Sequence, residues 1–95
     1  MIFIYQIDYE KIKENISLLN KNDYLVLKSN AYGFGFKKVL KLAINLNMRK
    51  FALIDINDCI YIKKNYPEAI VLLLGPINKN NLFLCEKYQI IFTIL

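Results

Sequence analysis

A lysine and a tyrosine beside two glycines make residues 28–35 the part of this sequence best suited to chemistry. The segment reads Lys28-Ser29-Asn30-Ala31-Tyr32-Gly33-Phe34-Gly35. It holds two of the chain's three glycines, a residue type that lets the backbone approach a ligand closely. Lys28 directly follows an apolar run that predicts a strand, so its ammonium group would point across the mouth of a sheet. By position alone, the better explanation is a solvated lysine before a glycine-rich turn.

The residue types that are missing restrict the chemistry further. The chain of 95 residues has no histidine, which excludes Ser-His and Cys-His nucleophile pairs and removes the usual nitrogen ligand of zinc, copper and iron. Cys59 and Cys85 are far apart in sequence, so neither a thiolate metal site nor a disulfide framework is indicated. We expect both to be small buried apolar residues. Catalysis would use Lys, Tyr, Ser, Asp or Glu, and no metal site is predicted.

Helices and strands alternate in the pattern that would position this segment. Apolar residues at three- and four-residue spacing predict helices, the first of them after Asp8, a favourable N-cap residue. The helices are expected at residues 9–20, 36–47, 57–65 and 78–88. Unbroken apolar runs predict strands covered on both faces, as in a parallel sheet. The strands are expected at residues 24–27, 51–54, 69–74 and 90–95.

This alternation is repeated βα winding, which indicates the α/β class. Such winding builds either an open doubly wound sheet or a closed barrel, and four strands are too few to close an eight-stranded barrel. In both architectures the βα loops lie at the carboxyl ends of the strands, where ligands bind. The segment 28–35 is one of these loops. The chain is therefore one domain or part of one.

The string from Tyr24 to Gly35 resembles the pyridoxal-phosphate attachment segment of bacterial alanine racemases. The family pattern runs Val, Lys, Ala or Ser, Asn, Ala, Tyr, Gly, His, Gly, and residues 27–35 follow it with Leu first and Phe34 in place of His. Residues 51–63 and 72–75 resemble the family's second strand and helix and its third strand and turn. The resemblance covers essentially the whole chain in order. It implies that residues 1–95 are the amino-terminal part of a TIM (β/α)8 barrel domain, with a leading helix and about four βα units.

The resemblance also implies a reaction and a cofactor, pyridoxal 5'-phosphate. Lys28 would form the Schiff base with the cofactor aldehyde, which requires a neutral amine, so burial and nearby positive charge must lower its pKa. After the substrate amine displaces it, Lys28 would act as one of two catalytic bases. The Tyr32 hydroxyl would reach the cofactor phosphate. The implied activity is interconversion of L-alanine and D-alanine for peptidoglycan precursors in the cytoplasm, although related enzymes that act on serine or basic amino acids share the segment.

Several parts of the family's site have no counterpart in residues 1–95. Phe34 removes a polar side chain near the site. The family's second base is a tyrosine from the carboxyl-terminal β domain of the partner subunit in a homodimer, and that domain is absent from this sequence. We therefore expect no racemase activity from residues 1–95 alone. A partial barrel would leave strand edges and apolar surface unpaired, so we also expect poor solubility or self-association.

An RNA-recognition module is the alternative from another functional class. Gly33-Phe34-Gly35-Phe36 resembles the core of the RNP1 motif, in which Phe34 and Phe36 would stack on single-stranded bases. Against this, Tyr32 stands where the motif has a basic residue, and residues 37–47 have helical period. The net charge of +5 favours no nucleic-acid partner, because the lysines are spread along the whole chain. No apolar run is long enough to span a membrane.

The remaining ionisable and aromatic residues are assigned structural roles. Glu10 and Glu14 lie one helical turn apart, which is typical of solvated charge on a helix surface. Asp58 is expected near a helix start, and Asp55 ends a strand without an assigned role. Two tyrosines, Tyr61 and Tyr66, are expected to be packing aromatics.

Overall fold

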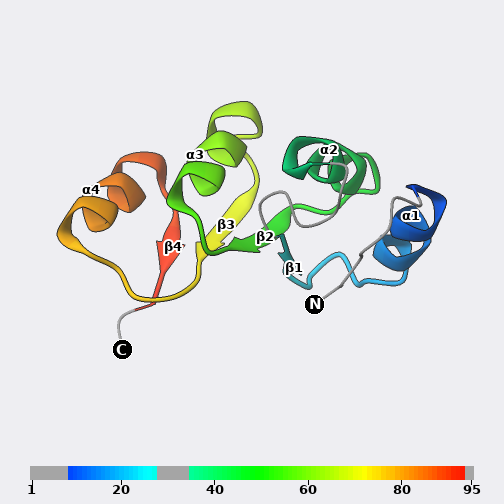
Figure 1. The fold of residues 1–95 in the computed structure, drawn as a ribbon, viewed down its shortest axis with the longest axis horizontal. Helices are drawn as coiled ribbons and strands as arrows, with labels where there is room; N and C mark the ends of the chain where they lie inside the picture. The colour runs from blue at the N-terminus through cyan, green and yellow to red at the C-terminus, as the bar shows by residue number, and fades with distance from the viewer. Residues whose placement is uncertain (1–8, 28–34, 94–95) are drawn as a thin grey trace.

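The computed structural model describes residues 9–27 and 35–93, which form an α/β structure with a four-stranded parallel sheet (Figure 1). The helices are α1 (Tyr9–Ser17), α2 (Phe36–Asn45), α3 (Ile56–Asn65) and α4 (Lys79–Tyr88). The strands are β1 (Leu25–Val26), β2 (Lys50–Leu53), β3 (Ile70–Leu73) and β4 (Ile91–Phe92). All eight elements lie where the sequence predicts them, and most are a few residues shorter.

The four strands pair in the order of the sequence. The sheet runs β1-β2-β3-β4, and each neighbouring pair is parallel. Right-handed crossovers that always step in the same direction place every crossover helix on the same face of the sheet. Figure 1 shows this arrangement, with α2, α3 and α4 along one side of the strands and α1 beyond α2. A doubly wound sheet would reverse its strand order and cover both faces, so the observed winding is consistent with part of a barrel.

Strand alternation divides the sheet residues between two faces. Leu25, Phe51 and Val71 share one row toward the helices and are almost fully buried. The opposite face carries another apolar row, Val26, Ala52, Leu72 and Ile91. Its members are less evenly covered, because Ile91 is 47% exposed whereas Ala52 is buried. The continuous apolar runs in the sequence therefore supply both faces of the sheet, of which the helices cover one.

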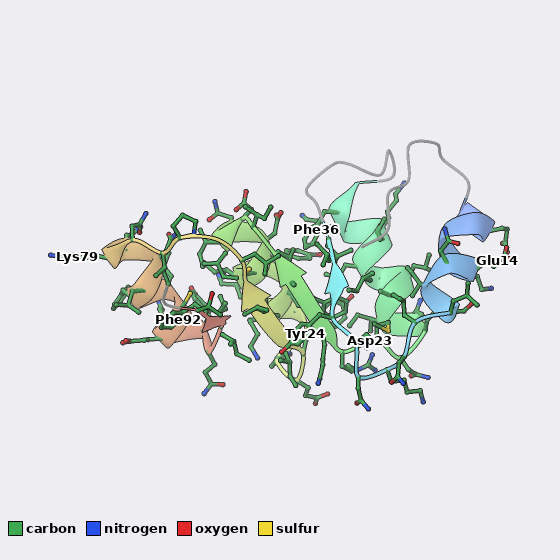
Figure 2. All side chains as sticks on the ribbon, turned by 90° about the horizontal axis from the view of Figure 1, so that it is seen from below. Glu14, Asp23, Tyr24, Phe36, Lys79 and Phe92 are labelled. Atoms are coloured by element: carbon green, nitrogen blue, oxygen red, sulfur yellow. The ribbon has the colours of Figure 1, made fainter. Side chains whose placement is uncertain are left out.

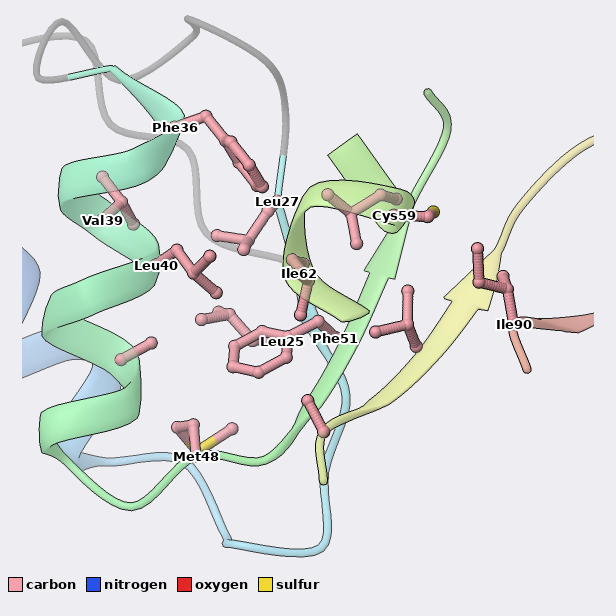
Figure 3. Close-up of a cluster of buried hydrophobic side chains, with 14 of the residues drawn as sticks. Leu25, Leu27, Phe36, Val39, Leu40, Met48, Phe51, Cys59, Ile62 and Ile90 are labelled. Atoms are coloured by element: carbon pink, nitrogen blue, oxygen red, sulfur yellow. The ribbon is translucent and has the colours of Figure 1, made fainter. Parts of the chain in front are cut away.

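The hydrophobic core fills the layer between the sheet and the helices (Figure 3). Val39 and Leu40 of α2 and Ile62 of α3 point toward Leu25 and Phe51 of the sheet. Among the side chains that the structure describes, no buried polar group lacks a hydrogen-bond partner. No polar or charged residue is buried among the described residues, so the core is held together by dispersion and the hydrophobic effect.

Local hydrogen bonds end the helices and set the turns. The α1 helix ends at Ser17, whose Oγ donates to the Glu14 carbonyl at 2.6 Å. In the loop between α1 and β1, the Asp23 carboxylate accepts a hydrogen bond from the Asn20 N–H at 3.2 Å. Lys63 Nζ donates to the carbonyls of Pro67 and Ala69, each at 2.8 Å, which fixes the connection from α3 to β3.

None of the helices within residues 9–27 and 35–93 has the length and apolar character needed to cross a bilayer. This finding agrees with the sequence, in which charged residues interrupt every apolar run before it reaches the length of a membrane span.

Replacing Phe51 tests the role of the core. Phe51 is fully buried in the central strand β2, so Phe51→Ala should lower the free energy of unfolding by about 3–5 kcal/mol, through lost burial and a residual cavity. Ile54 lies one residue beyond the same strand and is 68% exposed. Ile54→Ala should therefore change the free energy of unfolding by less than about 0.5 kcal/mol. Urea unfolding followed by circular dichroism measures both. Equal losses in the two variants would contradict this core.

Candidate functional site

The carboxyl edge of the parallel sheet is the candidate site. The loops that follow β1, β2 and β3 all leave the sheet at this edge because the strands are parallel. The β1 ladder reaches Leu27, whose N–H donates to the Ala52 carbonyl at 3.0 Å. Lys28, Tyr32 and Phe34 lie outside the described residues. The residues that flank their segment on both sides, Leu27 and Gly35, are described.

Two glycines at this edge adopt backbone conformations that other residues avoid. Gly35, between the segment and α2, has φ 83°, and Gly75, after β3, has φ 90°. Apart from the chain neighbours of each glycine, no described residue lies within 4 Å of a Cβ added at either position. The described residues therefore leave room beside the backbone of both loops for a bound group. The sequence pointed to Gly35 as part of the segment 28–35, and to Gly75 as part of the turn after the third strand.

An aromatic and cationic cluster stands at the start of α2. The ring centroids of Phe36 and Tyr61 lie 5.8 Å apart with an interplanar angle of 69°, an edge-to-face pair. Lys37 Nζ lies 4.7 Å from the centroid of the same Tyr61 ring. Such contacts contribute about 0.5–1.5 kcal/mol for an aromatic pair and about 0.5–1 kcal/mol for an exposed cation–π contact. Tyr61 is therefore a packing aromatic, as expected, and it also links α3 to the beginning of α2.

The burial of Phe36 overturns the RNA-binding alternative. Phe36 is 7% exposed and belongs to the core, so its ring is not free to stack on a base. Figure 2 shows it at the start of α2, whereas Tyr24 lies at the other end of β1. The RNP1 motif would need this residue on a strand, facing outward from the sheet. The observed helix and the wholly parallel pairing of the described strands exclude that arrangement.

The acidic residues near the candidate site are structural. Asp55 is the N-cap of α3, and its Oδ1 accepts from the Asn57 N–H at 2.7 Å. The role that the sequence left open for Asp55 is thus a helix cap, and Asp58 lies in the first turn as expected. Glu10 and Glu14 are exposed on α1. The described residues contain no group of three His, Cys, Asp or Glu side chains that could hold a metal ion.

Both cysteines are free thiols buried between α3, α4 and the sheet, as the sequence predicts. Burial, together with the nearby Cys85 and the carboxylates of Asp58 and Asp55, raises the pKa of the Cys59 thiol from 9.0 to about 12. Burial also raises the pKa of Cys85. A neutral, enclosed thiol is a poor nucleophile, so these cysteines do not contribute to the site.

The sequence of the chain matches one known protein family over most of its length. Residues 7–95 match the family described as alanine racemase, N-terminal domain. The chain belongs to this family. The match spans residues 28–35 and every helix and strand of the described structure.

Curated relatives carry the same family name or a related one. The chain is 28% identical over 94 residues to "Alanine racemase 1" of Bacillus subtilis (strain 168), covering 93% of this chain and 24% of the relative. It is 34% identical over 76 residues to "Alanine racemase" of Acinetobacter baumannii (strain SDF), covering 79% of this chain and 20% of the relative. It is 29% identical over 90 residues to "Lysine racemase" of Oenococcus oeni (strain ATCC BAA-331 / PSU-1), covering 95% of this chain and 23% of the relative. The chain thus spans a quarter or less of each relative, and no solved structure gives a significant match.

Thiol labelling tests the burial of the cysteines. Because the folded pKa of Cys59 lies above its usual value of 9.0, the thiol stays protonated at pH 8, and labelling by iodoacetamide should be more than about tenfold slower than in urea. By linkage, the contribution of this neutral thiol to stability is complete below pH 9 and declines as the pH rises toward about 12. Mass spectrometry of the labelled peptides measures each cysteine separately. Equally fast labelling of Cys59 in folded and unfolded protein would contradict its burial.

Proposed function

We propose that this chain forms the cofactor-binding part of a pyridoxal 5'-phosphate-dependent amino-acid racemase that interconverts L-alanine and D-alanine. The observation that carries the proposal is the family match over residues 7–95, with the attachment segment directly after β1. In this proposal Lys28 and Tyr32 are the cofactor-binding residues and Lys28 is a catalytic base. The active protein is a homodimer, residues 1–95 correspond to the first part of its barrel, and its product enters peptidoglycan precursors.

The neighbours of Lys28 in sequence support its assignment. Leu27 is 2% exposed and belongs to the helix-facing core. Successive side chains of a strand point to opposite faces, so a strand continued by one residue would direct Lys28 to the helix-free face. Two described residues of that face, Val26 and Ala52, are apolar. An apolar environment disfavours the charged form of a lysine and lowers its pKa, as attachment of an aldehyde requires.

Lys28 and Tyr32 would have separate roles in holding the cofactor and in catalysis. Lys28 would hold the cofactor covalently through its side-chain nitrogen. As a neutral amine, Lys28 would also take the α-proton from one face of the amino acid. The Tyr32 hydroxyl would donate a hydrogen bond to the cofactor phosphate. The bound cofactor supplies the electron-withdrawing system that stabilises the negative charge left on the α-carbon.

Trapping of the attached cofactor tests the proposal. Borohydride adds hydride to the carbon–nitrogen double bond, so the purified protein treated with pyridoxal phosphate and borohydride should carry a stable adduct on Lys28. Peptide mapping by mass spectrometry locates the adduct. Lys28→Arg keeps the charge but cannot form the bond, and it should lose the adduct.

The other lysines provide the control for this experiment. Lys38 and Lys41 of α2 are exposed and should stay unmodified under the same conditions. An adduct distributed over these surface lysines, with no preference for Lys28, would overturn the proposed function.

A further inference from the structure

We draw no further inference here: the strongest candidate, the helix-free apolar face of the sheet with Ala52, Leu72 and Ile91, carries none, because nothing in the described part of the chain shows what covers it.

Discussion

Parallel pairing of strands in sequence order is the constraint on which the rest of the structure depends. Each strand of the described chain lies beside the strand that precedes it, and each connection contains a helix. Because every crossover steps in the same direction with the same hand, the helices gather on one face and the βα loops gather at one edge. The closed core and the candidate site are therefore two consequences of a single winding rule.

The same winding explains why the apolar residues serve two purposes. Those facing the helices, such as Phe51 and Val71, are fully buried and hold the layers together. Those on the other face, such as Ala52 and Leu72, add little to this core but make the helix-free surface apolar. A lysine directed toward such a surface would lose part of its hydration, which favours the neutral amine. The chemistry proposed for Lys28 thus depends on residues that the helix-facing core does not need.

Most of the fold was predictable because its signals are local. Apolar runs, helical spacing and capping residues such as Asn78 are read from a few neighbouring positions, and they placed every element to within a few residues. The first strand is shorter than predicted because a strand needs a paired neighbour, and only Leu25 and Val26 of the first run form a regular ladder with β2. The link between Lys37 and Tyr61 was not predictable, because it joins residues of different helices that only the crossover brings together.

The aromatic residue at position 36 shows how the correct interpretation could be chosen from sequence alone. As part of Gly33-Phe34-Gly35-Phe36, it fits a base-stacking motif that requires an exposed ring on a strand. As the first member of a series with Val39, Leu40 and Ala43, it fits the buried stripe of a helix, which needs every member on one side. Both patterns use the same ring, but they require opposite exposures, so only one can hold. The stripe extends over two helical turns and ends in the core, which is why the longer periodic signal outweighed the shorter motif.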